Sequence, residues 1–338
     1  MQFITNGPDI PDELLQAHEE GSVVFFCGAG ISYPAGLPGF KSLVEKIYQQ
    51  LETERYSNEE SSFCKGQYDM TLDLLERRTP GQRSSMRTTL KKILQPKLRR
   101  KGALNTHRAL LQLAHNHDGL RLVTTNFDRI FEYIKKKDKQ SFKSFVAPML
   151  PIPKISRWDG LVYLHGLLPE QEKDTAELNQ LVLTSGDFGL AYLTERWASR
   201  FVSEVFRNYV VLFVGYSIDD PVLRYMMDAL SADRMMGEDT PRAYALGDCM
   251  PGEDKEKINE WRSKGAIPIL YDSSNAHSAL HETLHAWSEN YRDGSLSKER
   301  IVMEYASTKP SNSTQQDNFI GRMLWALSDI NTPKNSCV

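Results

Sequence analysis

Cysteine is scarce in this chain of 338 residues. The four cysteines are Cys27, Cys64, Cys249 and Cys337, and no two of them are spaced as a Cys-x-x-Cys pair. The sequence therefore offers neither a zinc half-site nor a disulfide framework. We predict a protein of a reducing, cytoplasmic compartment that holds no zinc or other metal.

An excess of charge of one sign and long apolar runs are also lacking. Lys and Arg number 41 against 44 Asp and Glu, and the formal net charge of −3 excludes an overall basic field that would attract nucleic acid or anionic lipid. No run is long and apolar enough to span a bilayer, and the N-terminus lacks the basic-then-apolar order of a signal peptide. With 40% hydrophobic residues, the composition is typical of a globular protein that does not enter a membrane.

Short apolar runs alternate with helical patterns along most of the chain. Six runs have the composition of buried strands, at residues 22–27, 120–125, 160–165, 209–214, 242–246 and 266–270. Residues 181–184 are expected to be short and extended, and the spacing of apolar residues predicts helices over 40–48, 191–208 and 277–287. We predict an α/β fold: a Rossmann-like, open, mostly parallel sheet of about six strands with helices on both faces.

Two segments differ from this pattern. Residues 51–106 are polar and strand-poor, with helical spacing around 69–77 and 84–94, which predicts an inserted helical module. After residue 293 the composition turns to Ser, Thr, Asn, Gln and Pro, ahead of a helix-like stretch at 319–330. We predict one catalytic domain over 1–293, then a linker and the start of a C-terminal helical segment over 294–338. Whether the natural protein continues past Val338 stays open.

Small and polar residues follow four of the predicted strands. Taken singly, each has a structural explanation: glycine turns serve packing, Asn126 and Asp128 can cap a helix, and one histidine at a strand end is usually a satisfied side chain. Because the carboxyl ends of parallel strands meet at one edge of a sheet, their recurrence favours a shared ligand pocket instead. In chain order these residues are Gly28, Gly30 and Ser32, then Asn126 and Asp128, then His165, then Gly215 and Ser217.

Four motifs contain these residues: Gly28-Ala-Gly-Ile-Ser32-Tyr-Pro-Ala-Gly36-Leu-Pro38-Gly-Phe40, Thr125-Asn-Phe-Asp128, Leu164-His-Gly166 and Gly215-Tyr-Ser217. In order and spacing, across about residues 22–220, they resemble the motif set of the sirtuins. The resemblance implies that NAD is bound and is consumed as a substrate.

The resemblance also implies a role for each matching residue. Gly28, Ala29, Gly30 and Ser32 would wrap the pyrophosphate, because backbone N–H groups can approach where side chains are small. Asn126 would orient the nicotinamide ribose and a water, and His165 would be the general base. The remaining positions would bind the cofactor: Asp128 at the carboxamide, and Gly215 and Ser217 along the adenosine half.

The chain departs from protein-deacylating sirtuins in two respects. Those enzymes carry two Cys-x-x-Cys pairs that hold zinc, and this chain has none. The aspartate and arginine that usually flank the phenylalanine of the first motif are replaced by Gly39 and Lys41. What remains resembles the sirtuin-like proteins of bacterial anti-phage systems, which implies hydrolysis of NAD to nicotinamide and ADP-ribose in abortive infection.

This second resemblance also implies partners. They are a homo-oligomer, a translocase ATPase of the HerA type or another component of a defence system, and a phage-derived trigger. Two alternatives stay open: a module that senses NAD or ADP-ribose without catalysis, and an NAD-dependent protein deacylase. The sequence does not distinguish a linear from a cyclic ADP-ribose product, and it does not exclude nuclease activity.

Overall fold

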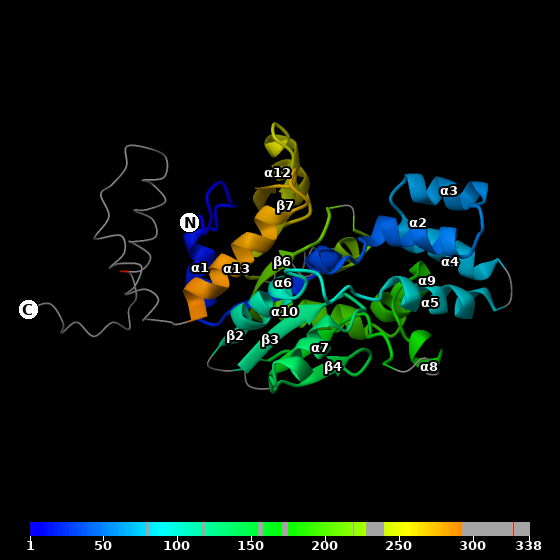
Figure 1. The fold of residues 1–338 in the computed structure, drawn as a ribbon, viewed down its shortest axis with the longest axis horizontal. Coiled ribbons are helices and arrows are strands. Elements are labelled where there is room, and N and C mark those ends of the chain that lie inside the picture. Colours follow the sequence, from blue (N-terminus) through cyan, green and yellow to red (C-terminus); the bar gives the residue numbers. More distant parts are fainter. Residues whose placement is uncertain are drawn as a thin grey trace, which may run out of the picture.

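A seven-stranded parallel sheet forms the centre of the molecule (Figure 1). The computed structural model describes residues 1–78, 81–116, 119–154, 158–170, 175–218, 220–227, 240–292 and 327. Its strand order is β4-β5-β3-β1-β6-β7-β8, and all neighbours on this path are parallel. The strands are β1 (Val23–Cys27), β3 (Gly119–Thr124), β4 (Ser144–Val146), β5 (Gly160–Tyr163), β6 (Val210–Val214), β7 (Ala243–Cys249) and β8 (Ile267–Asp272). A short β2 (His115–Asn116) pairs antiparallel with β3. The predicted Rossmann-like α/β fold is confirmed.

Strand β1 lies at the point where the strand order reverses. All five of its residues are buried, as expected of a strand covered on both faces. Cys27 pairs with Thr124 of β3 on one side and with Val214 of β6 on the other, so the three strands end at the same level. In open α/β sheets, ligands bind in the crevice beyond such a switch point.

Helices cover both faces of the sheet. Phe25 and Cys27 pack into the core on one face, and Val24 and Phe26 pack into the core on the other, because successive side chains of a strand point to opposite sides. The first face carries α1 (Asp12–Glu19), α6 (Asn105–Leu113), α7 (Ile130–Lys137) and α13 (Ser278–Arg292). The second carries α10 (Trp197–Asn208), α12 (Asp254–Ser263) and the helical residues 221–227.

A separate group of helices lies at the end of the molecule away from the N-terminus (Figure 1). It consists of α2 (Phe40–Gln50), α3 (Ser57–Cys64), α4 (Tyr68–Arg77) and α5 (Gln82–Ile93). These helices share an apolar core of their own, to which Leu178, Leu181 and Leu183 also belong. Helices α3 to α5 fall in the range 51–106, whereas α6 packs on the sheet. The domain limits 1–293 and 294–338 stay a prediction, and residues 294–338 other than Leu327 lie outside the described residues.

Several local elements differ from the sequence-based expectation. The predicted helix over 191–208 is two elements, a π-helix η2 (Gly189–Thr194) and α10, separated at Arg196, whose φ of 60° is left-handed. Strand β4 was not predicted, since three residues carry too little pattern. Residues 181–184 lie outside the sheet. Three short helices complete the description: the 3-10 helix η1 (Ala29–Ala35), α8 (Thr175–Leu178) and α9 (Ser185–Phe188).

A search of the described helices finds none with the length and hydropathy needed to cross a membrane.

Candidate functional site

A pocket opens where the carboxyl ends of β1, β3, β5 and β6 meet the group of helices α2 to α5. The space between its walls is about 590 Å³, including the part open to solvent. The strand ends supply most of its polar side chains, and the helices and the segment 182–188 supply its apolar wall. It is lined by Ala29, Ser32, Leu37, Pro38, Phe40, Leu43, Leu94, Thr125, Asn126, Phe127, Asp128, His165, Val182, Leu183, Phe188, Asp220 and Val222.

Ser32, Asn126 and Asp128 form one hydrogen-bonded cluster in this pocket. The Ser32 hydroxyl donates to Asp128 Oδ2 at 2.9 Å and accepts from Asn126 Nδ2 at 3.2 Å. The turn after β3 presents Asn126 because its backbone amide is held by the Thr124 hydroxyl at 3.1 Å. Residues that are almost a hundred positions apart in the chain are thus held together by side-chain contacts.

Asp128 has a structural contact as well as a place in the pocket. Its Oδ1 accepts the amide of Ile130, the first residue of α7, at 3.0 Å. Burial raises the pKa of this carboxyl, and the bonds from Ile130, Ser32 and Asn126 lower the pKa in part. The helix-capping explanation and the site explanation therefore both apply to Asp128.

His165 follows β5 and is 1% exposed. Burial lowers the pKa of its imidazole to about 3, so the ring is neutral near pH 7. Nε2 lies 2.9 Å from the Tyr192 hydroxyl, whereas Nδ1 is buried without a partner among the described residues. A neutral imidazole at the edge of a pocket can accept a proton from a substrate or a water.

The glycines that follow β1 and β6, namely Gly28, Gly30 and Gly215, have a packing role. The amides of Gly28 and Gly30 donate to the carbonyl oxygens of Val214 and Gly215 at 2.9 and 2.8 Å. A Cβ on Gly30 would lie 2.8 Å from Gly215 Cα, and Gly215 itself has a left-handed φ of +73°. The pocket is therefore lined by Ala29 and Ser32 rather than by Gly28, Gly30 or Gly215.

Ser217 is exposed and lies outside the pocket lining. The structure brings Ala29, Ser32, Asn126, Asp128 and His165 together. Contact of the glycines with a pyrophosphate, and of Gly215 and Ser217 with an adenosine, stays a prediction.

Part of this domain matches the model of a known family. Residues 120–269 match the model of the SIR2-like domain. The chain contains a SIR2-like domain. The sirtuin-like character inferred from the four motifs is confirmed.

Two relatives extend the similarity of this SIR2-like chain beyond the matched residues. It is 30% identical over 328 residues, 95% of its length, to the uncharacterised protein y4cA of Sinorhizobium fredii. It is 24% identical over 241 residues, 69% of its length, to the NAD(+) hydrolase ThsA of Cytobacillus dafuensis. The chain spans 27% of the length of y4cA and 42% of the length of ThsA.

Tyr192 contacts His165 of the pocket, and the sequence did not reveal this contact. It is 4% exposed on the π-helix η2, and its hydroxyl lies 2.9 Å from His165 Nε2. Its ring packs with those of Phe188 and Tyr225, so in the sequence it has the pattern of an ordinary core residue. The π-helix, an element often found at functional sites, is its distinguishing signal.

Asp220 precedes Pro221 and an apolar run, which in the sequence is typical of a residue at a helix start. The helix-start contact exists: Oδ1 accepts the amide of Val222 at 2.9 Å, next to the helical residues 221–227. The side chain also lines the pocket, and burial raises the pKa of its carboxyl to about 6. Position in a pocket together with a perturbed pKa is a mark of a functional carboxyl that only the fold reveals.

Among the described residues, no group of three or more His, Cys, Asp or Glu side chains is arranged to hold a metal ion.

Proposed function

We propose that this SIR2-like domain is an NAD⁺ hydrolase that breaks the bond between nicotinamide and ribose. The observation that carries the proposal is the convergence of Asn126, Asp128 and His165 in one pocket at the switch point of the sheet. The similarity to a protein named as an NAD(+) hydrolase supports the same activity.

The reaction places modest demands on the protein. When the C1′–N bond breaks, its electron pair moves to the nicotinamide nitrogen and neutralises the positive charge of the ring. The ribose is left as an oxocarbenium-like cation, to which a water adds at C1′. The protein must therefore orient ribose and water and stabilise positive charge on the sugar. In the proposal Asn126 holds the ribose and the water, and Asp128 receives the carboxamide.

His165 is the proposed acceptor of the water proton. A pKa of about 3 makes it a weak base. A water that adds to an oxocarbenium cation becomes far more acidic than free water, so a weak neutral base is sufficient once the cation forms. A positioned general base typically contributes about 10² to 10⁴ in rate.

The absence of the Cys-x-x-Cys pairs from the sequence disfavours a protein deacylase. We further propose that the activity is restrained until assembly, through a homo-oligomer or a partner such as a HerA-type ATPase, because an unrestrained hydrolase would deplete the NAD of its host. The role in anti-phage defence rests on the family resemblance.

The test is incubation of the purified chain with NAD, followed by chromatography for nicotinamide and ADP-ribose. We expect both products from the wild type and a loss of at least about 10²-fold in Asn126→Ala and His165→Ala. Wild-type rates in His165→Ala would contradict the proposed base. Binding of NAD by calorimetry without cleavage, in the chain alone and in its assembled form, would support a sensor instead.

A further inference from the structure

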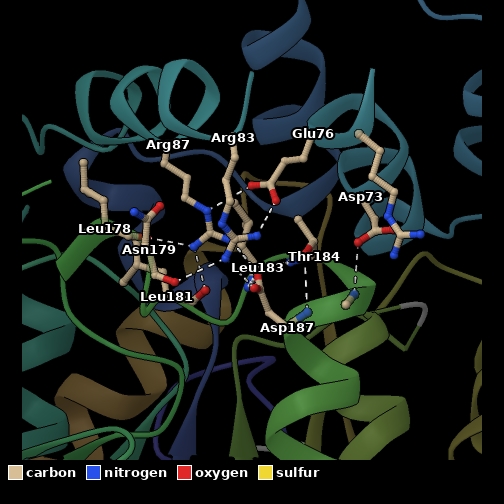
Figure 2. Close-up of polar contacts among 12 residues, drawn as sticks. Asp73, Glu76, Arg83, Arg87, Leu178, Asn179, Leu181, Leu183, Thr184 and Asp187 are labelled. Atoms are coloured by element: carbon tan, nitrogen blue, oxygen red, sulfur yellow. Dashed lines mark hydrogen bonds and ion pairs between the residues drawn. The ribbon is translucent and has the colours of Figure 1, made fainter. Parts of the chain in front are cut away.

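One buried arginine connects the helical group α2 to α5 with the wall of the pocket. Arg87 lies on α5 and is fully buried. Its Nε donates to Glu76 at 2.9 Å, its Nη1 donates to the carbonyl oxygens of Leu178 and Leu181 at 2.8 Å each, and its Nη2 donates to Asp187 (Figure 2). The guanidinium therefore joins two helices of the group to the segment 178–187.

A second arginine, Arg83, binds the same two carboxylates as Arg87. Arg83 donates to Glu76 at 2.5 Å and to Asp187 at 2.7 Å, so two cations and two carboxylates alternate around one centre. Arg83 is 39% exposed, whereas Arg87 has no exposure. Buried ion pairs contribute little net stability compared with apolar residues of the same volume. The buried arginine is therefore better explained by the position that it imposes on its partners.

Asp187 connects the two arginines to the backbone at the start of α9. Its Oδ2 accepts the amides of Leu183 and Thr184 at 3.1 and 2.9 Å, which shapes the start of α9. Burial by itself would raise the pKa of Asp187, but Arg87 and Arg83 hold the pKa below its usual range. The carboxylate therefore stays charged and bound to both the arginines and the turn.

The same segment touches the proposed base. Val182, Leu183 and Phe188 line the pocket. The Val182 amide donates to the carbonyl oxygen of His165 at 2.9 Å, and the edge of the Phe188 ring packs against the imidazole with centroids 5.1 Å apart. A displacement of residues 178–188 would therefore move both the pocket wall and the contacts of His165.

We propose that Arg87 is a positioning residue for the pocket. It holds residues 178–188 in place, and through them it makes the geometry around His165 depend on how α4 and α5 pack. The helical group then acts as part of the active site, although only its apolar residues reach the pocket. The catalytic consequence rests on the proposed function, but the structural consequence does not.

The experiment compares Arg87→Met and Arg87→Lys with the control Arg78→Met. Arg78 forms an ion pair with the buried Glu59 in the same helical group, and its other hydrogen bonds go to Thr53 and Glu54 rather than to residues 178–188. For each variant, hydrogen exchange of the peptide 178–188 and the kcat and KM for NAD are measured at one pH.

In Arg87→Met we expect faster exchange in 178–188 and a fall in kcat/KM of about 10²-fold, the effect of a displacement on the order of 1 Å. Lysine keeps the charge without the planar fork, so Arg87→Lys should recover part of both losses. In Arg78→Met exchange in 178–188 should stay as in the wild type.

Unchanged exchange in Arg87→Met, or an equal increase in Arg78→Met, would overturn the proposal. If Arg87→Met does not fold, the comparison of Arg87→Lys with Arg78→Met decides in the same way. If the wild type does not cleave NAD, the exchange data still decide whether Arg87 positions the segment, and the proposed function alone fails.

Discussion

The hydroxyl of Tyr192 determines how His165 is held. It lies 2.9 Å from Nε2, and the two side chains are buried together beside Phe188. Because Nε2 is occupied by this bond, the hydroxyl helps to fix the tautomer and, together with the Phe188 ring, the orientation of the imidazole. Removal of that oxygen is therefore a test of His165 that leaves the imidazole in place.

For Tyr192→Phe we expect NAD affinity close to wild type and a kcat about tenfold lower, the loss of one hydrogen bond that positions the base. Steady-state kinetics with calorimetric binding separate the two effects. Tyr225→Phe is a matched control, since it belongs to the same aromatic stack but bonds to Asp69. An unchanged kcat in Tyr192→Phe would exclude a role for the bond in catalysis.

Asp220 gives the pocket a group that titrates near neutral pH. Its pKa of about 6 means that the carboxylate is charged at pH 7.5 and largely neutral at pH 5. A charged carboxylate stabilises a cationic sugar, so we expect NAD cleavage to fall as pH falls through about 6. Asp220→Asn should be slower at pH 7.5 and should lack this limb of the pH–rate profile.

Asp272→Asn, at the exposed end of β8, is the control for Asp220→Asn and should keep the wild-type profile. If the limb near pH 6 persists in the profile of Asp220→Asn, another group is responsible for it.

At the scale of elements, η1 packs closely against the turn after β6, beside the switch point of the sheet. The two backbones approach so closely that neither Gly30 nor Gly215 has room for a side chain. This explains a glycine pattern that in the sequence alone is read as phosphate binding. The turn has a packing role, and its contact with a phosphate stays a prediction.

We expect Gly30→Ala to lower the free energy of unfolding by about 1–3 kcal/mol, because the new Cβ would overlap Gly215 Cα at 2.8 Å. Gly189→Ala is the matched control: nothing lies within 4 Å of its Cβ position and its φ of −56° is helical. That variant should be neutral or slightly stabilised. Urea denaturation measures both, and equal midpoints would contradict the packing role.

At the scale of the whole molecule, four of the described histidines make folding sensitive to acid: the buried His18, His107 and His165 and the half-buried His281. Burial lowers the pKa of His107 and His165 to about 3 and that of His18 and His281 to about 4. In the unfolded chain histidine titrates near 6.5. Between these values the unfolded state binds more protons than the folded state, so the free energy of unfolding falls as pH falls.

From pH 7.5 to pH 5.5 we expect a lower urea midpoint, with each of the four histidines contributing at most about 1.4 kcal/mol per pH unit below 6.5. Burial raises the pKa values of Asp128 and Asp220, which makes the free energy of unfolding rise as pH falls. These two carboxyl groups are fewer than the four histidines. Equal stability at the two pH values would contradict the prediction.

The amino-acid sequence by itself determined the α/β class and the strands β1, β3, β5, β6, β7 and β8. Strands buried on both faces must be continuous apolar runs, and their polar ends mark Asn126, Asp128 and His165 as neighbours along one edge. The sequence did not reveal β4 or the break at Arg196, where packing overrides a weak local pattern.

Only the tertiary structure decided which other groups line the pocket or contact the residues that form it. Tyr192 and Asp220 have local explanations as a core aromatic and a helix cap, and Arg87 has the sequence pattern of an exposed helix position. Their contacts join segments up to about a hundred residues apart. Helical and strand periodicity report only whether a side chain is buried, whereas the partner that it meets there is set by how distant elements pack.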